Sequence, residues 1–431
     1  MIAPPEGPTP TIALRPWLLL AVFSLVGFLI NASTFYSLGV VLPHMVRDGG
    51  WSWTAAGFGF TVLGAAVGAS SYFPALLIRR FGVRPTLLLG AGVMVAGFGC
   101  LSATYGLALY FLGAGLCGVG YQMMALIPGT HVIAATFQKR GLPFGIFFTA
   151  SALGGVAGPW MVLAVMGHFH DDWRLLWRLW MLVTLVMGLV CAAALGGRRW
   201  FAQAADQTDR ELVADIAKPA RKGVWRTAEA WTVRAAVRTP QFYILLAAYF
   251  GHLLVGVTVS SLSVAHLTER GVTTALAGAM LSLEALVQTG VRAVGGVMGD
   301  YVDPRYLLIF ALGALAIGSA ALSVAHNVPM MLIYATGSGL GFGLTALAVA
   351  MLLLNYYGRG HNLEIFSLTC LVGTVSALGP TLGGLLRDSS GGFGSTFQLY
   401  AGVIGMVFVA AVFMRPPKSH GDHPLGEPSP R

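Results

Sequence analysis

Residues 280–300 read MLSLEALVQTGVRAVGGVMGD, a stretch with the length and apolarity of a membrane-spanning helix that also carries three strongly polar side chains. Glu284, Gln288 and Arg292 are spaced by four residues, so on a helix they lie along one face. An arginine side chain keeps its charge in proteins, and a charge at the centre of a membrane helix costs on the order of 2.5–3.5 kcal/mol. This face is therefore predicted to border a polar cavity rather than lipid.

The composition of the whole chain agrees with a membrane location. Of 431 residues, 56% are hydrophobic and only 10% are charged, and the mean hydropathy is +0.74. A soluble protein of this length needs far more charge to cover its surface, so the sequence predicts an all-α integral membrane protein. The four cysteines all fall in apolar stretches, where we interpret them as small buried hydrophobic residues, and their spacing gives no support for a disulfide or a metal site.

The hydropathy pattern predicts twelve transmembrane helices. The predicted spans are 16–45, 54–78, 86–104, 106–135, 143–166, 175–196, 241–264, 273–299, 304–325, 328–357, 363–386 and 396–414.

The basic residues predict the orientation of these spans. The net charge is +9, and about 20 of the 26 Lys and Arg fall on one side of the predicted topology. Because an excess of basic residues marks the cytoplasmic face, both termini are expected to be cytoplasmic. The charge is thus an orientation signal and does not indicate a nucleic-acid partner.

The polar segment 198–238 divides the chain into two groups of six spans. It is far longer than any other connection, and we interpret it as a cytoplasmic linker, partly helical, that Trp225 and Trp231 anchor at the interface. The expected parts are a disordered cytoplasmic tail (1–15), a six-helix bundle (16–197), the linker (198–238), a second six-helix bundle (239–414) and a second disordered cytoplasmic tail (415–431).

The two groups also resemble each other. ATFQKRG at 135–141 precedes GPW at 158–160, and NYYGRG at 355–360 precedes GPT at 379–381. The offset between the matching residues is about 220, which is the organisation of transporters that rock two halves around a site at the membrane midplane. The sequence therefore predicts two pseudo-symmetric bundles.

With these features the chain resembles the major facilitator superfamily over essentially its whole length. RRFGVRP at 79–85 and GDYVDPR at 299–305 are similar to degraded copies of the superfamily's loop motif between its second and third helices. In the family this motif makes cytoplasmic gating contacts. The resemblance assigns gating to Arg79, Arg80, Arg84, Asp300 and Arg305.

Within the superfamily the chain is most similar to the monocarboxylate transporters and their bacterial oxalate/formate relatives. TFQKRGLPFGIFFTASALGG at 136–155 looks like the family's signature between helices 4 and 5, and RDGGWSW at 47–53 looks like its Asp-Gly-Gly-Trp-x-Trp signature. RTPQFYILLAAYF at 238–250 is similar to the bacterial entry into helix 7. In the family's helix 8 an Asp precedes the Arg by four residues, whereas here Gln288 takes that position.

Arg292 is the leading candidate for a substrate-binding residue, because a planar guanidinium at membrane depth is suited to hold a carboxylate in bidentate geometry. The alternatives are a structural ion pair with Glu284 or an arginine that reaches toward the interface. Glu284 and His252 are candidates for proton coupling. Other polar residues at membrane depth complete the predicted substrate-binding set, namely Asn31, Tyr121, Gln122, His252, Gln288, Tyr334 and Cys370. An interhelical hydrogen bond is the alternative for Tyr121 and Gln122, and packing is the alternative for His252.

The absence of lysine from the spans bears on the cargo. The resemblance implies an essential lysine in helix 1 of the animal carriers and in helix 11 of the oxalate carrier, and neither span contains one here. A single interior cation favours a monocarboxylate such as lactate, pyruvate or an aromatic acid. We expect alternating access with proton symport by a monomer in a bacterial inner membrane, with no cofactor, metal or nucleic acid.

Two other functions remain open. Gly145, Gly154, Gly158 and Pro159 fit a helix 5 pattern of proton-coupled antiporters, so a drug or organic-anion antiporter is the alternative. We interpret these glycines as packing at the interface between the halves. A transporter-like receptor would use the same pocket, whereas no motif of the chain predicts an enzyme.

Overall fold

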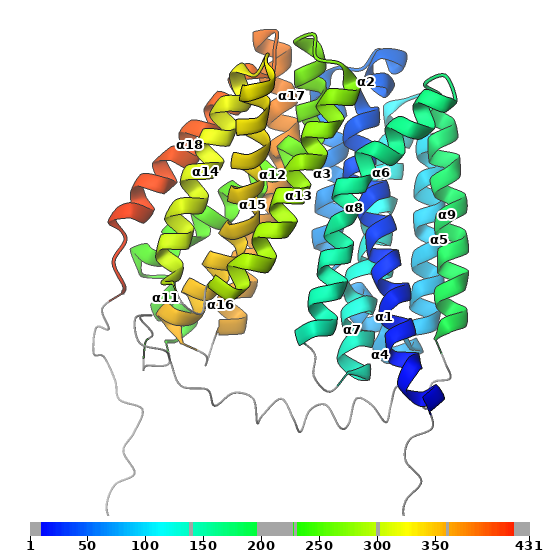
Figure 1. Ribbon diagram of the computed structural model, residues 1–431, viewed down its shortest axis with the longest axis horizontal. Helices are drawn as coiled ribbons and strands as arrows, with labels where there is room; N and C mark the ends of the chain where they lie inside the picture. The colour runs from blue at the N-terminus through cyan, green and yellow to red at the C-terminus, as the bar shows by residue number, and fades with distance from the viewer. Residues whose placement is uncertain are drawn as a thin grey trace, which may run out of the picture.

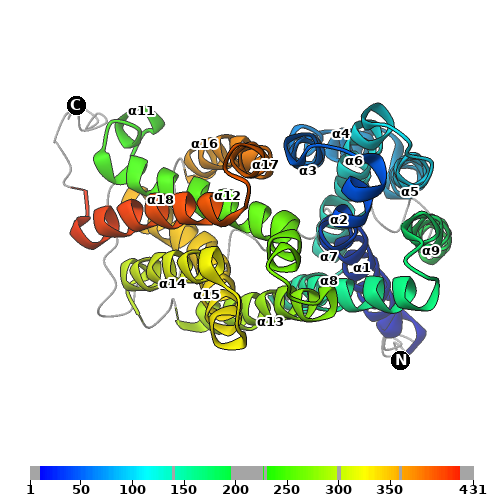
Figure 2. The ribbon, with the colours of Figure 1, turned by 90° about the horizontal axis from the view of Figure 1, so that it is seen from above.

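The computed structural model describes residues 10–137, 141–195, 227, 231–298, 302–358 and 362–417, and all regular structure in these ranges is helical. The helices form two bundles that lie side by side (Figures 1 and 2). The first bundle consists of α1 (Pro10–Asn31), η1 (Ala32–Tyr36), α2 (Ser37–Gly49), α3 (Trp53–Ala69), α4 (Phe73–Phe81), α5 (Val83–Ser102), α6 (Leu107–Tyr121), η2 (Gln122–Leu126), α7 (Ile127–Thr136), α8 (Gly141–His168) and α9 (Trp173–Ala194).

The second bundle begins after the segment that was predicted to be a linker. Most of that segment lies outside the described residues. The elements of this part are α11 (Val233–Ala236), α12 (Pro240–Glu269), α13 (Thr274–Met298), α14 (Pro304–Val324), α15 (Val328–Tyr357), α16 (Asn362–Val375), η4 (Ser376–Leu378), α17 (Gly379–Ser390) and α18 (Gly394–Phe413).

Eleven of the twelve predicted spans correspond to helices long and apolar enough to cross a membrane. The exception is the second, predicted as one helix over 54–78, which is divided between α3, of 17 residues, and α4. Ser70 and Ser71 form a turn after α3, and Pro74 occupies the first turn of α4. Proline is tolerated in a first turn, where its missing N–H has no partner to lose, so its position is compatible with a new helix that starts after the turn.

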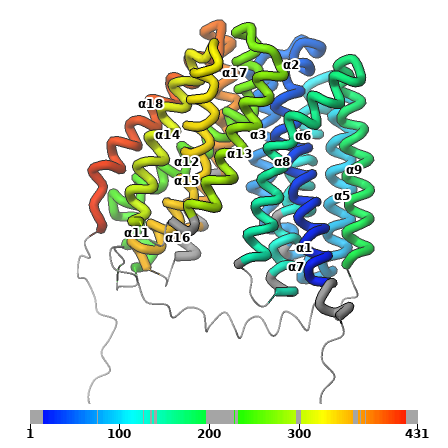
Figure 3. Tube along the Cα trace, viewed as in Figure 1, coloured from blue at the N-terminus to red at the C-terminus, as the bar shows by residue number. Residues whose placement is uncertain are grey.

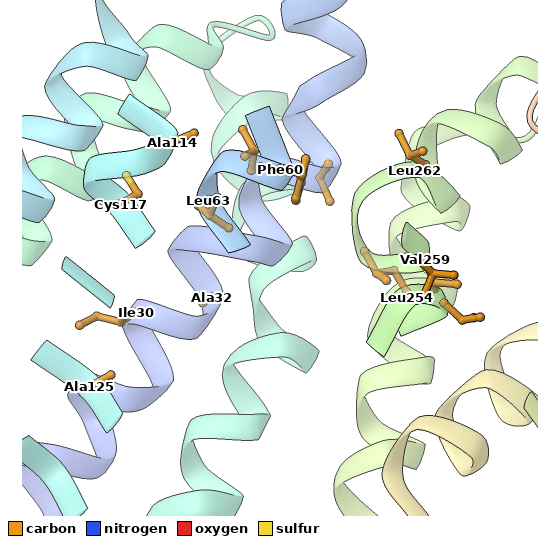
Figure 4. Packing of buried hydrophobic residues seen from close by; sticks show 14 of the residues in the cluster. Ile30, Ala32, Phe60, Leu63, Ala114, Cys117, Ala125, Leu254, Val259 and Leu262 are labelled. Carbon is orange, nitrogen blue, oxygen red and sulfur yellow. The ribbon is translucent and has the colours of Figure 1, made fainter. Parts of the chain in front are cut away.

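Each bundle is apolar both inside and out. Buried side chains such as Phe60 and Leu63 in the first bundle and Leu254 and Val259 in the second belong to the core cluster (Figure 4). The outer surface also carries large exposed apolar side chains, among them Leu189 on α9, which is 56% exposed. A surface of this kind suits contact with lipid, where every backbone polar group must be satisfied within the helices.

The bundles touch at one end of the molecule and diverge toward the end where α1 begins and α18 ends (Figures 1 and 3). Glycines allow the close approach at the touching end. A methyl group on Gly57 would collide with the carbonyl of Pro380, and one on Gly384 would collide with the carbonyl of Trp53. Small residues bring helix backbones together in this way in membrane proteins.

The glycines of α8 have a different role from the one predicted. A methyl group on Gly154 would collide with the Phe28 carbonyl, and one on Gly158 would crowd Ala32. Both contacts are with α1 and η1 of the same bundle, so the prediction that these glycines pack the two halves together is wrong. Gly145 faces open space.

We expect Gly154→Val to lower the melting temperature of the purified protein by several degrees, because backbone atoms of α1 cannot move aside and overpacking costs about 1–3 kcal/mol. Gly167→Val is the matched control, since it lies on the same helix with nothing within 4 Å of an added Cβ. Equal melting temperatures for the two variants would contradict the close approach of α1 and α8.

Candidate functional site

A cavity of about 500 Å³ lies between the bundles, at the depth of Arg292. Four parts of the chain line it, namely α1, the junction of α6 with η2, α8 and α13. The lining residues are Gly27, Asn31, Tyr121, Ala125, Gly145, Phe147, Phe148, Thr149, Ser151, Ala152, Gln288, Thr289, Arg292 and Ala293.

The side chain of Arg292 is exposed to this cavity. Its guanidinium carbon lies 5.6 Å from the centroid of the Phe342 ring on α15, a cation–π contact that orients the group without neutralising it. Within the described part of the chain the ion pairs join Arg47 to Asp48 and Arg387 to Glu269 and Asp388, and none involves Arg292. The guanidinium is therefore available to an anion from solution.

Four of the residues predicted to bind substrate lie in the cavity wall. Gln288 and Arg292 come from one face of α13, as their spacing predicted, and Asn31 and Tyr121 face them from the first bundle. The Asn31 amide donates a hydrogen bond of 2.8 Å to the Ser151 carbonyl, which joins α1 to α8.

Four other predicted residues do not line the cavity. Gln122 is one position after Tyr121 and so points about 100° away around the helix, where its amide donates to the Val67 carbonyl of α3 at 3.1 Å. His252 is buried against the rings of Tyr249 and Phe342, at 4.9 and 5.3 Å between centroids.

The remaining two belong to the interior of the second bundle. Tyr334 is fully buried in α15. Cys370 is half-buried, and its sulfur lies 3.6 Å from the Tyr249 hydroxyl. Tertiary packing of the second bundle, rather than the cavity, accounts for the positions of His252, Tyr334 and Cys370.

Glu284 lies two turns from Arg292 but has a different environment. Its side chain is 5% exposed, and Tyr36, Tyr334 and Arg292 are within electrostatic range of its carboxyl group. The ion pairs of the described residues do not join it to Arg292. The alternative of a structural Glu284–Arg292 ion pair is therefore not supported.

Two turns of π-helix, η1 and η2, bring Tyr36 and Tyr121 toward Arg292. In η1 the wide turn leaves backbone carbonyls that hydroxyl groups satisfy, since Thr34 donates to Ile30 at 2.7 Å and Ser37 donates to Ala32 at 2.8 Å. Such turns are frequent at functional sites. The polar stretch INASTFYSLG at 30–39 signalled this position, but the π geometry itself has no signature in the sequence.

The predicted gating residues that the structure describes lie at the diverging end of the molecule. Arg79, Arg80 and Arg84 are exposed on α4 and α5, and Asp300 lies outside the described residues. Arg305 donates to the Val412 carbonyl at 2.6 Å, a contact within the second bundle.

A polar latch holds the bundles together at the opposite end. The carboxylate of Asp388 on α17 accepts hydrogen bonds from the backbone N–H and hydroxyl of Thr54, at 2.9 and 2.6 Å, and from the Trp53 N–H at 3.3 Å. These groups form the N-terminus of α3, where a negative charge is stabilised. Arg387 places its guanidinium 2.9 Å from the Glu269 carboxylate and 5.8 Å from the Trp53 ring.

Two bundles of helices long and apolar enough to cross a membrane, with a cavity between them, are typical of a membrane transporter. The sequence profile of the Major Facilitator Superfamily matches residues 24–361 and 244–430, and the chain belongs to that family. It is also 23% identical over 350 residues to the fujikurins efflux protein of Gibberella fujikuroi, a match that covers 78% of this chain and 68% of the relative.

Solved transporters share the fold. The nucleoside transporter NupG has a TM-score of 0.71 at 11% identity, with 93% of this chain and 100% of that chain covered. A POT family transporter in complex with 5-aminolevulinic acid has a TM-score of 0.65 at 17% identity, with 91% and 95% covered. At these identities the likeness establishes the fold alone. Membership of the Major Facilitator Superfamily makes the protein a transporter rather than an enzyme.

We expect Asp388→Ala to loosen the touching end of the bundles, because it removes every acceptor for the cross-bundle contacts with Trp53 and Thr54. The measurement is the rate of thiol labelling of Ser260→Cys, whose backbone carbonyl lies against Gly39 at this end, in a variant without the native cysteines. We predict at least threefold faster labelling.

Asp303→Ala is the control, since Asp303 caps α14 within its own bundle. Unchanged labelling in Asp388→Ala, or an equal increase in both variants, would show that the latch does not hold the bundles together.

Proposed function

We propose that this protein is a secondary active transporter of monocarboxylates, with Arg292 as the residue that binds the carboxylate. One observation carries the proposal, which is a guanidinium exposed to a cavity between two transmembrane bundles without a carboxylate partner among the described residues. A planar guanidinium binds a carboxylate through two parallel hydrogen bonds. Tyr121, from the first bundle, and Gln288, one turn before Arg292 on α13, line the same cavity, and we assign them to the rest of the contact.

A single charge in the substrate matches the one cation that the described residues place in the cavity wall. No lysine occurs in any predicted span, so a dicarboxylate would bring a second negative charge that lacks a partner. Burying an unpaired charge is costly, which favours a monoanion. The acid bound in the structure of the POT family transporter is in keeping with such a cargo on this fold.

We further propose proton symport, which makes the transport of a monoanion electroneutral. Glu284 is the favoured proton carrier, because its carboxyl group is buried two helical turns from Arg292. His252, which contacts the same Phe342 ring as Arg292, is the other candidate.

The proposed orientation follows from the basic residues. The diverging end of the bundles carries the clusters of arginine, so we assign it to the cytoplasm together with both chain termini and the linker, in a bacterial plasma membrane. The cavity then faces inward in this structure. The signatures RDGGWSW and TFQKRGLPFGIFFTASALGG support the monocarboxylate and oxalate/formate branch. We propose that the protein works as a monomer, because one chain supplies both bundles.

The second candidate is an efflux antiporter for drugs or organic anions. The similarity to the fujikurins efflux protein favours it, as does the open Gly145 in the helix 5 glycine pattern. An efflux protein would use the same cavity with a different cargo and an opposite proton flux.

Counterflow separates these functions. Proteoliposomes loaded with unlabelled lactate or benzoate are expected to accumulate the labelled acid, whereas oxalate-loaded or tetraphenylphosphonium-loaded vesicles are not. Exchange of the lipophilic cation alone would support the drug antiporter, and binding without exchange of any acid would indicate a receptor.

Proton coupling predicts that acidifying the outside from about pH 7.5 to about pH 6 accelerates uptake of the acid into proteoliposomes. Because a glutamine cannot bind the proton, Glu284→Gln should abolish this acceleration while retaining exchange of acid for acid. His252→Gln is the matched comparison. Loss of the pH dependence of uptake in that variant alone would identify His252, rather than Glu284, as the proton carrier. Acceleration by internal acidification instead would indicate antiport.

A further inference from the structure

The lining residues of the cavity are unevenly distributed among the helices. This distribution bears on how the part of the substrate other than the carboxylate binds. α8 contributes more lining residues than any other element, and four of them, Gly145, Phe148, Thr149 and Ala152, follow helical spacing along one face. We call this face the α8 subsite. Gln288 and Arg292 of α13, in the other bundle, line the same cavity.

The α8 subsite presents open space and a fixed aromatic wall. A Cβ added at Gly145 would meet nothing within 4 Å. Phe148 is 47% exposed. Its ring stacks on that of Phe144, with 6.1 Å between the centroids, and meets the ring of Phe147 edge-on, with 5.3 Å between the centroids. A large apolar side chain is thus fixed against the cavity with one side uncovered.

Most polar groups next to the subsite are already used by the protein. The Asn31 amide donates to the Ser151 carbonyl, and the Ser151 hydroxyl donates to the Phe147 carbonyl. The Thr289 hydroxyl donates to the Ala285 carbonyl. Arg292 is the charged group that the described residues place in the cavity wall, so the charged end of a ligand is expected beside it. The α8 subsite offers Phe148, Gly145 and Ala152 together with the Thr149 hydroxyl, and the small residues Gly27 and Ala125 also line the cavity.

The volume of the cavity is larger than a three-carbon acid fills. A volume of about 500 Å³ accommodates roughly sixteen water molecules at about 30 Å³ each. Lactate or pyruvate has six non-hydrogen atoms and would leave most of this space filled with water. The volume falls in the range of about 300–1,000 Å³ that is usual for drug-sized ligands.

We propose that the α8 subsite binds an aromatic or similarly bulky apolar group, so that the transporter prefers bulky aromatic monocarboxylates to three-carbon acids. The carboxylate lies on Arg292, and the ring packs against Phe148 over Gly145. This inference rests on the proposed function, because it places the carboxylate on Arg292. It assigns selectivity to α8, whereas Arg292 selects only for charge.

The test compares two acids that differ only by a phenyl group, propionate and 3-phenylpropionate, in their affinity for the full-length purified protein. Burial of the ring predicts at least tenfold tighter binding of 3-phenylpropionate. In Gly145→Leu the new side chain fills the subsite, so the affinity for 3-phenylpropionate should fall at least tenfold while that for propionate changes less than twofold.

Gly167→Leu provides the matched control on the same helix, because its added side chain also meets open space but lies outside the cavity wall. It should keep both affinities. Circular dichroism and melting temperature confirm that the variants are folded.

The outcomes separate this inference from the proposed function. Equal affinities for the two acids, or a preference that survives Gly145→Leu, would overturn the α8 subsite while Arg292-dependent binding of both acids leaves the carboxylate site intact. If neither acid binds, or if both bind equally well to Arg292→Gln, the proposed function itself fails.

Discussion

An arginine keeps its proton under physiological conditions, and inside a membrane its charge must be stabilised by a partner, by water or by a ligand. Arg292 has a cavity before it and the face of Phe342 beside it, and no carboxylate within ion-pair distance among the described residues. The charge of Arg292 is therefore stabilised only while the cavity holds water or an anion. The diverging bundles satisfy this need, because they admit water to the depth of the charge.

The touching end of the molecule complements this open end. Gly57 and Gly384 allow backbone-to-backbone approach between the bundles, and Asp388 adds a charge-assisted contact to the N-terminus of α3. A rocking motion that exposes Arg292 to the other side must break the Asp388 contacts and close the cavity. The Thr61 hydroxyl adds contacts of 2.6 Å with the Ala377 carbonyl and the Thr381 hydroxyl, and these polar contacts must also form and break in every cycle.

Much of the fold could be predicted from the sequence, because apolar stretches of about 20 residues have few alternatives in a membrane. The division of the second span at Pro74 was missed, since hydropathy does not register a broken helix. In the site, Arg292, Gln288, Asn31 and Tyr121 were predicted to bind substrate and do line the cavity. Polar residues at membrane depth are conspicuous in a sequence.

The residues that were misplaced or missed share one physical cause, which is that sequence fixes neither the rotation of a helix nor the contacts between bundles. Gln122 and Tyr121 are neighbours, yet only Tyr121 faces the cavity. Phe148 and Gly145 are ordinary residues of an apolar helix until α8 is placed opposite α13. Asp388 resembles any acidic residue near a helix end, and its role exists only because α3 of the other bundle begins beside it.

The most direct test of the account is whether Arg292 holds the anion. The measurement is the thermal stabilisation of purified protein by a panel of mono- and dicarboxylates, in the native protein, in Arg292→Ala and in Arg178→Ala, which removes an exposed arginine of α9. The account predicts that a monocarboxylate stabilises the native protein and Arg178→Ala but not Arg292→Ala. Equal stabilisation of Arg292→Ala, or stabilisation by lipophilic cations and by no carboxylate, would contradict it.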